Sequence, residues 1–484
     1  MALRIKSQEN RAPPQILYNV SHHNTQKQEG KCSMPIIRQN CLFDMQELFE
    51  MEPTHRFNAI FSTLELAPLL LIFDKKTRRG APRELNYGAM IYSLIARVVE
   101  RIPTIKLLVN RLKNDPFFRF DCGFLLSDDV PSEASYSRMI STISETDAMS
   151  KVQDVLIAQA IQEGYITEES LAIDATHFEA RDKPEASEKK EKSAPKKRGR
   201  KPKNEQAKWQ EAKQKREAEK TIYEKEIVYQ LNESVETLVN QMPISPNWGV
   251  KKNSDGKNTF WFGYKGHLAV STESQYIIRS LMSSGSLNDG KAAIPLLKQI
   301  QQLMPGKFQA GLMDKGYDYT AIYQQLRSMN LHAVIAYNPR NEGVILGFDE
   351  HFAPTCVREY SYRYDSYDAK YETLKYSRPK ECTTCPLKDD SLCQKVYKIK
   401  RSVDLRKYTS PARGSIKWSI YYKQRSAVER VNAYLKEYFD LNNVRHRTGK
   451  KAKVHFQFVT LIYNASRLAI DRLKSAKQAF LPVA

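Results

Sequence analysis

The stretch "YYKQRSAVERVNAYLKEYF", residues 421–439, contains neither glycine nor proline and predicts a single helix. Because an α-helix turns about 100° per residue, Tyr422, Arg425, Glu429 and Lys436 fall within an arc of about 60°. The opposite face carries the apolar residues Ala427, Val431, Tyr434, Leu435 and Tyr438. One face is therefore suited to a core, and the other presents one carboxylate among two cations and a phenol. Taken alone, a charged face of this kind is most often a solvated surface.

The whole chain carries a large excess of positive charge. It has 484 residues, with 76 Lys and Arg against 55 Asp and Glu, and a net charge of +21. That excess favours a polyanionic partner, with nucleic acid the first candidate and an acidic membrane surface the second. No apolar run approaches the roughly 18 residues of a membrane span, and the N-terminus has no signal-peptide pattern. We therefore expect a cytoplasmic protein without membrane association, and seven cysteines in so long a chain predict no disulfide scaffold.

The first third of the chain predicts helices only. Residues 1–40 are polar and predict a flexible N-terminus. Residues 41–165 have helix-period apolar positions, as in "LNYGAMIYSLIARVV", and predict an all-helical domain. Ser132 or Ser135 is the expected N-cap of one of its helices. Such a domain serves either DNA binding, as a helix-turn-helix-like unit, or packing and dimerisation.

The period of the apolar residues then changes to that of strands. "SLAIDATHFEA" predicts a buried strand ending at Asp174, and "QAGLMDKGYD" predicts another ending at Asp314. Between them, "NTFWFGYKGHLAV" and "YIIRSLMSS" predict two neighbouring strands, followed by a helix that Asn288 or Asp289 caps. A helix "YTAIYQQLRSM", a strand "HAVIAYN" and a last helix "KVHFQFVTLIYNASRLAIDRL" complete the order. The fold class is therefore α/β, with a mixed sheet flanked by helices.

Residues 181–255 form a basic insert between the first two predicted strands. Its segment "PKKRGRKPK" resembles the core of an AT-hook, in which Arg198 and Arg200 would lie in the minor groove of A·T-rich DNA. The alternative, which we favour, is an arm that binds phosphates without sequence preference. The segment 204–242 that follows predicts a long exposed helix.

A second insert, residues 340–415, holds four cysteines. Cys382 and Cys385 form the close Cys-x-x-Cys pair of a metal knuckle, whereas Cys356 and Cys393 stand at irregular distances. Structural zinc is the first expectation, reduced thiols the second and an iron–sulfur cluster the third.

Three carboxylates stand out on this basic chain: Asp174 and Asp314 at strand ends, and Glu429 on the late helix. Magnesium prefers oxygen ligands, and two such ions about 3.5–4 Å apart can hold both oxygens of an in-line phosphoryl displacement. Rigid strand ends could bridge the metals, a helix carboxylate could complete one site, and neighbouring cations would meet phosphate. The pattern therefore predicts metal-dependent chemistry on nucleic acid.

The order and spacing of these residues resemble insertion-sequence transposases with an RNase H-like catalytic core and a DDE triad. The YREK signature of one branch of that family is matched by Tyr422, Arg425, Glu429 and Lys436. Two, three and six residues separate these positions in turn. "LAIDATHFEA" and "GLMDKGYD" resemble its two catalytic strands, and "FGYKGHLAV" the strand between them. The resemblance covers residues 40 to 475 and places the catalytic domain at 166–475, with the two segments above as insertions.

The resemblance implies a DNA transposase of the bacterial cytoplasm, acting at the nucleoid. Asp174, Asp314 and Glu429 would be the ligands of two Mg²⁺ or Mn²⁺ ions, and Tyr422, Arg425 and Lys436 would contact phosphates. Metal-activated water would cleave at the transposon end, and the freed 3′-hydroxyl would attack double-stranded target DNA. Synapsis of two ends implies a homodimer on DNA.

Two other functions stay open at this point. One is a metal-dependent nuclease of the same fold that cuts without joining, and the other is a non-catalytic DNA-binding derivative. Four further residues have competing structural and functional readings. His177 is expected to support the strand rather than bind metal, and Asp289 to cap a helix rather than act as a fourth ligand. His267 either contacts DNA or the active site or packs within the fold, and His446 either holds the DNA backbone or lies in a solvated loop.

Overall fold

The computed structural model describes most of the chain after residue 47. The described residues are 48–74, 85–167, 169–184, 203–252, 255–343, 345–390 and 393–479. The expected flexible N-terminus (1–40) and the AT-hook-like Arg198 and Arg200 lie outside these ranges.

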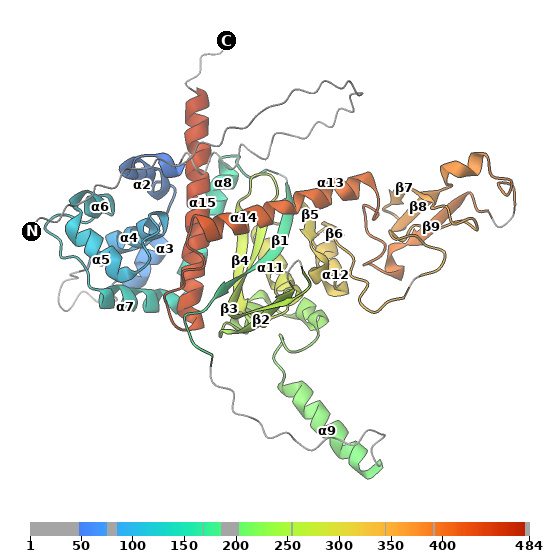
Figure 1. Ribbon diagram of the computed structural model, residues 1–484, viewed down its shortest axis with the longest axis horizontal. Helices are drawn as coiled ribbons and strands as arrows, with labels where there is room; N and C mark the ends of the chain where they lie inside the picture. The colour runs from blue at the N-terminus through green and yellow to red at the C-terminus, as the bar shows by residue number, and fades with distance from the viewer. Residues whose placement is uncertain are drawn as a thin grey trace, which may run out of the picture. The chain divides into compact units, whose positions relative to one another are not determined.

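Helices fill the N-terminal part of the described chain (Figure 1). They are α2 (Pro53–Phe61), α3 (Ala67–Leu70), η1 (Leu71–Phe73), α4 (Tyr87–Val99), α5 (Ile105–Asn114), α6 (Pro116–Asp121), α7 (Glu133–Ser144) and α8 (Ala148–Gln162). Ser132 is the N-cap of α7, as predicted for one of two serines, and its hydroxyl accepts a hydrogen bond from the Ser135 amide. The last helix, α15 (Gly449–Ala479), packs against α2, α4, α7 and α8 and also against β4 of the sheet.

A mixed sheet forms the centre of the catalytic part, as the sequence predicts. Its strands are β1 (Glu169–Glu179), β2 (Asn247–Lys252), β3 (Asn258–Ser271), β4 (Ile277–Ser284), β5 (Phe308–Met313) and β6 (His332–Ile335). β3 runs antiparallel to β1 and β4, whereas β1, β5 and β6 are parallel neighbours. This is the strand arrangement expected of an RNase H-like core, with β2 added as a hairpin partner of β3.

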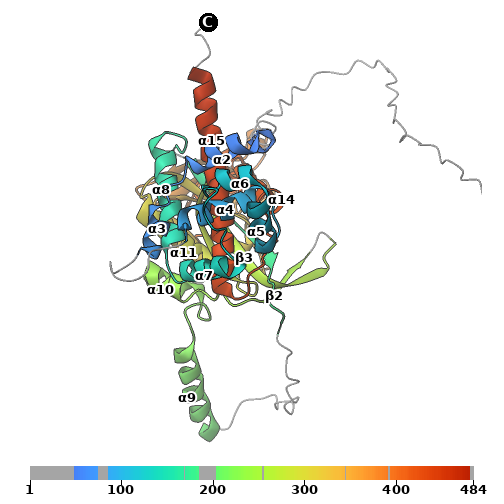
Figure 2. The same cartoon turned by 90° about the vertical axis from the view of Figure 1, so that its left-hand side faces the viewer.

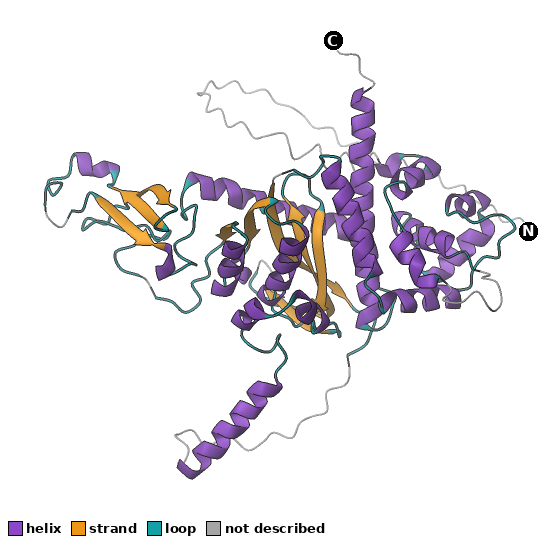
Figure 3. Cartoon of the chain, turned by 180° about the vertical axis from the view of Figure 1, so that it is seen from behind, coloured by secondary structure: helices purple, strands orange, loops and turns teal. Residues whose placement is uncertain are grey.

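Helices cover both faces of this sheet (Figures 1 and 3). Leu312 of β5 packs toward α13 (Ile416–Gln424). The preceding residue, Gly311, faces the other way, because a Cβ added there would meet Leu326 of α12 (Thr320–Ser328). α11 (Gly290–Leu303) contacts β4 and α12. α14 (Ser426–Glu437) contacts β1 and β3. Alternate residues of each strand therefore face different helices.

Two sequence expectations about these elements are wrong, and one strand was missed. The stretch 421–439 forms two helices, because hydrogen bonds three residues apart tighten the turn at Arg425, between α13 and α14. β1 does not end at Asp174, because residues 175–179 continue to pair with β3. The strand β2 was not anticipated.

The predicted long helix 204–242 is also wrong. It is divided into α9 (Lys203–Glu219), η2 (Ile227–Asn232) and α10 (Val235–Asn240). The segment after α9 does not continue the helix. Its Tyr223 hydroxyl donates to the Leu238 carbonyl, and its Gln230 side chain donates to the Lys291 carbonyl of α11. Ser234 then caps α10 through the Thr237 amide.

The cysteine-containing insert has its own small antiparallel sheet. β8 (Thr373–Ser377) lies between β7 (Arg363–Asp368) and β9 (Val396–Lys400), with short turns η4 (Lys380–Thr383) and η5 (Arg401–Val403) beside them. Its core is small and consists of Phe352, Ala353, Tyr362, Leu374, Tyr376, Tyr408 and Ala412. So few buried side chains supply little hydrophobic stabilisation.

Within the described ranges, the helices are too short or too polar to cross a lipid bilayer.

Candidate active site

Asp174 and Asp314 lie side by side on neighbouring parallel strands. The register pairs Ile173 of β1 with Met313 of β5, so the aspartates are the next residues on each strand. Adjacent strands lie about 4.8 Å apart. Asp314 is two residues after Leu312 and so shares the face that packs toward α13, and the register puts Asp174 on the same face; both aspartates are half-buried. Asp314 is fixed locally, because its Oδ1 accepts a hydrogen bond of 2.8 Å from the Gly316 amide.

The surroundings of Asp174 disfavour its charge. Burial raises its pKa to about 7, and the charges of Asp314 and Asp289 push in the same direction. A backbone hydrogen bond from Ala175 and the charge of Arg425 oppose these effects without cancelling them. A nearby cation would therefore relieve an unfavourable concentration of negative charge at this place.

Arg425 connects the aspartates to Glu429. Its Nη2 lies 2.7 Å from Glu429 Oε1, and the Glu429 side chain is 51% exposed. Burial alone would lower the pKa of Arg425, but the hydrogen bond and charge of Glu429, with smaller contributions from Tyr422 and Asp174, raise it. Arg425 therefore lies within electrostatic reach of Asp174 while it is paired with Glu429. Glu429 lies on the same side of the sheet as the two aspartates, but its partner is the cationic side chain of Arg425.

Tyr422 packs beside this ion pair. Its ring stacks on Trp418 at 4.8 Å, and the two rings cover Ala310, Leu312 and Val334 of the sheet. The Arg425 guanidinium lies 5.6 Å from the Tyr422 ring centre. Packing against strand β5 thus fixes the end of α13 next to Asp314.

A group of lysines lies beyond Asp174 along β1. Burial lowers the pKa of His177 to about 4, and the positive charges of Lys436, Lys251 and Lys265 lower it further. Burial and the charge of Lys251 likewise lower the pKa of Lys436. Lys436, the last residue of the predicted signature, therefore lies within electrostatic reach of Lys251 of β2 and of His177.

Asp289 has a different role from the expected helix cap. It stands at the N-cap position of α11, but its side chain makes no capping hydrogen bond. Instead, its Oδ1 lies 2.8 Å from Lys265 Nζ, and Asn288 Oδ1 accepts from the Gly290 amide. Asp289 thereby contributes negative charge to the aspartate pair.

Tyr317 is a site residue that the sequence analysis did not single out. It is fully buried, and in the described part of the chain its hydroxyl has no hydrogen-bond partner. Burial raises its pKa well above the usual value, and the charges of Asp289, Asp174 and Asp314 add to this effect. Three aspartates therefore lie within electrostatic reach of one hydroxyl that has no hydrogen-bond partner among the described residues. The only signal in the sequence was the Asp-x-Gly-Tyr pattern itself.

The donor chemistry of the site fits a hard divalent cation. Carboxylate oxygens are the ligands that Mg²⁺ and Mn²⁺ prefer, and two of them stand on adjacent rigid strands. Across the described residues, no three Cys, His, Asp or Glu side chains are close enough to share an ion. Glu429 would have to leave Arg425 to join Asp174 and Asp314.

The predicted cysteine ligands lie near one end of the small sheet, but among the described residues no three of them are close enough to share a metal ion. Cys356 precedes β7, Cys382 and Cys385 follow β8, and Cys393 precedes β9. These strand ends are neighbours, since Ser377 pairs with both Arg363 and Val396. Burial raises the pKa of Cys382, and the charges of the other three thiols contribute.

The other two histidines with open roles, His267 and His446, are at least half-buried. His267 is buried, and its Nε2 lies 2.8 Å from the Ser283 hydroxyl. His446 is half-buried, and burial followed by the charges of His455 and Arg97 lowers its pKa to about 3.

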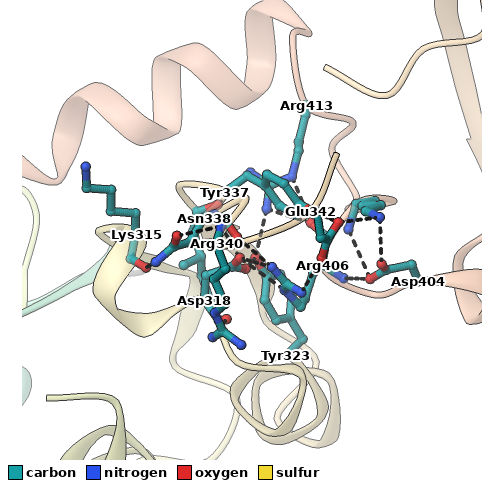
Figure 4. Close-up of polar contacts among 12 residues, drawn as sticks. Lys315, Asp318, Tyr323, Tyr337, Asn338, Arg340, Glu342, Asp404, Arg406 and Arg413 are labelled. Carbon is teal, nitrogen blue, oxygen red and sulfur yellow. Dashed lines mark hydrogen bonds and ion pairs between the residues drawn. The ribbon is translucent and has the colours of Figure 1, made fainter. Parts of the chain in front are cut away.

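A buried polar network fixes the segment that leads into α13 (Figure 4). Asp318 Oδ2 accepts hydrogen bonds from Arg406 Nη2 and Nε at 2.8 and 3.1 Å and from the Asn338 amide at 2.9 Å. Arg413 donates to the Ile335 carbonyl and to the Tyr323 hydroxyl. The end of the cysteine-containing insert is thereby held against β6 and the turn after Asp314.

Two transposase family models match the chain. Residues 167–465, more than half of the chain, match the family model described as a transposase DDE domain, and residues 46–142 match one described as a transposase domain (DUF772). No curated protein matches the chain. Among solved structures, the chain is similar to the piggyBac transposase in its synaptic complex with hairpin DNA. That similarity has 13% identity and a TM-score of 0.37 and covers 90% of this chain and 76% of that chain.

Proposed function

Since the chain belongs to the DDE transposases, which cleave DNA and transfer its strands, we propose that Asp174, Asp314 and Glu429 are its catalytic carboxylates. The observation that carries this proposal is the parallel register that makes Asp174 and Asp314 neighbours. The contact of α14 with β1, which brings Glu429 to the same part of the sheet, supports it further.

The family works with divalent metal ions, and the finer assignment here is two Mg²⁺ or Mn²⁺ ions. Asp174 and Asp314 would hold them, and Glu429 would join after it exchanges Arg425 for metal. When bound, such ions stabilise charge on the attacking and leaving oxygens of a phosphodiester.

The cationic and phenolic side chains of the signature bind DNA in this proposal. Arg425, once released from Glu429, has a planar guanidinium that can donate two hydrogen bonds to a phosphate. Tyr422 would hold Arg425 in place by stacking, and its hydroxyl would bind a second phosphate oxygen. Lys436 would bind the strand on the far side of Asp174, where Lys251 adds charge.

The partner is double-stranded DNA, both at the element's ends and at the target. We further propose a homodimer on DNA, a bacterial nucleoid location and a YREK-type site. Arg198 and Arg200 would add phosphate contacts from the basic insert.

Structural zinc is the second metal that we propose. Its ligands would be Cys356, Cys382, Cys385 and Cys393, and the neighbouring strand ends near which they lie support the proposal.

A plasmid assay tests the catalytic assignment. The full chain is incubated with Mg²⁺, a plasmid carrying the element with its flanking DNA, and a second plasmid as target. We expect excision and joined products from the wild type and neither from Asp174→Asn, Asp314→Asn or Glu429→Gln. Glu437→Gln, an exposed acid on the same helix, should behave as wild type.

The products also decide between the alternatives. Cleavage without joined products would identify a nuclease, and DNA binding without cleavage would identify a non-catalytic derivative. Cleavage that survives any of the three substitutions would refute the role of that residue.

A further inference from the structure

The β2–β3 hairpin has an exposed apolar face. Its antiparallel register pairs Trp248 with Phe262 and Val250 with Phe260, so these side chains share one face. Trp248 is 53% exposed, Val250 56% and Phe260 62%. The Trp248 ring meets the Phe262 ring edge-on, with centroids 5.6 Å apart. Large apolar side chains gathered in solvent commonly mark a binding surface.

The opposite face of the hairpin is anchored beside the candidate active site. Trp261 packs over Gly249, where a Cβ would lie only 2.2 Å from its ring. The same ring lies 4.6 Å from that of His177, on the strand that carries Asp174. The hairpin is therefore held by the catalytic strand.

The hairpin also extends past the rest of the sheet. β1 pairs with β3 only from Gly263 onward, so residues 258–262 have β2 as their strand partner. In Figure 2, the ribbon at β2 projects away from the helices. The exposed face is thus within reach of a strand that leaves the active site.

The charge of the hairpin indicates what binds there. Lys251, Lys252 and Lys257 are exposed on it, against one acid, Asp255. A second copy of the hairpin would bring like charges together, whereas a nucleic-acid strand would neutralise them. Aromatic faces beside lysines are the combination with which proteins bind unpaired nucleotides.

We propose that Trp248 and Phe260 form a stacking platform for unpaired DNA bases next to the cleavage site. This proposal rests on the proposed function, because the active site is what would generate the unpaired strand. Lys251 and Lys252 would bind its phosphates, and the rings would hold its bases regardless of sequence.

The test compares single-stranded with duplex DNA. Fluorescence anisotropy measures binding of the full chain to a labelled oligothymidine of about 20 nucleotides and to a duplex of similar length. The double variant Trp248→Ala/Phe260→Ala should bind the single strand about 10- to 100-fold more weakly and the duplex almost unchanged. Trp248→Tyr/Phe260→Tyr should keep single-strand affinity, since a ring remains.

A matched control is Phe117→Ala, which removes an 83% exposed ring from α6 and should change neither affinity. Unchanged single-strand binding in the double alanine variant would overturn the proposal, as would an equal loss on both DNAs. If that variant instead turned a dimer into a monomer in sedimentation with single-strand binding intact, the face would be a contact between copies. Plasmid cleavage by the wild type is a separate readout, so failure of the proposed function is distinguishable.

Discussion

At the residue scale, Arg425 acts on two of the three candidate catalytic carboxylates. It neutralises Glu429 directly and also acts on the charge of Asp174 from the same position. If the ion pair is the resting state of the site, then DNA phosphate and a metal ion would each take one member of it. The substrate would thereby replace a protein ion pair with two new ones.

Tyr317→Phe tests whether the unpartnered hydroxyl serves the substrate complex. Because the hydroxyl has no partner among the described residues, its removal should leave the melting temperature unchanged or slightly higher. We expect plasmid cleavage to fall by roughly 10- to 100-fold if the hydroxyl binds a group that arrives with DNA or metal. Wild-type cleavage by Tyr317→Phe would assign the ring to packing alone.

His267 should make stability depend on pH. Burial lowers its pKa to about 4, and the charge of Asp289 opposes this while that of Lys265 adds to it. Its unfolded pKa is about 6.5, so the unfolded chain binds more protons between these values, and stability is lost as pH falls from 6.5 toward 4. Between pH 7.5 and 5 the loss is about 2 kcal/mol from this group.

Urea unfolding at the two pH values measures the effect. His267→Gln, which can still bond to Ser283, should show a pH dependence smaller by that amount than the wild type. Equal pH dependence in both proteins would mean that His267 is not held neutral by burial.

At the scale of elements, the site depends on how β1, β5 and α13–α14 are fixed together. The parallel register aligns the two aspartates, and Trp418 and Tyr422 seat α13 on β5. The Asp318–Arg406 network holds the chain just before α13, so the cysteine-containing insert ends at a defined position. The insert is thereby connected mechanically to the helix pair that carries Arg425 and Glu429.

Asp318→Asn should therefore destabilise the protein strongly. Asp318 is fully buried, and its loss leaves the largely buried Arg406 with Glu342, 3.2 Å away, as its one remaining acidic partner in the described part of the chain. Breaking a buried ion pair in this way costs about 3 kcal/mol or more. Denaturant unfolding measures it, with Asp365→Asn as control, because that carboxylate pairs with Lys375 at the surface and its loss should cost far less. A loss equally small for both variants would contradict the structural role of the network.

The zinc proposal belongs to the insert. A core of so few residues needs an additional constraint, and four thiols at neighbouring strand ends would supply one. Elemental analysis of the purified protein should find one zinc per chain, and a chelator should lower the melting temperature. Cys382→Ser/Cys385→Ser should lose the metal, whereas Cys122→Ser, at a buried cysteine outside the insert, should keep it. Full metal content in the first variant would refute the assignment.

At the scale of the whole molecule, the sequence patterns predicted the individual strands and helices better than the contacts between them. Alternating apolar runs located β1, β3, β4, β5 and β6, and their order agreed with a mixed sheet. The sequence could not show that β1 continues beyond Asp174, because that depends on pairing with β3. It also could not show that Arg425 pairs with Glu429, that Asp289 pairs with Lys265, or that Tyr317 is unpartnered, since each depends on which side chains meet after folding.

Manganese binding tests the central claim that Asp174, Asp314 and Glu429 act as one site. Electron paramagnetic resonance of the full chain, titrated with Mn²⁺ in the presence of duplex DNA, counts bound ions without requiring catalysis. Asp174→Asn, Asp314→Asn and Glu429→Gln should each lower the number or affinity of bound ions, and Glu437→Gln should not. If Glu429→Gln binds Mn²⁺ as the wild type does, Glu429 is a partner of Arg425 only and the three carboxylates do not form one metal site.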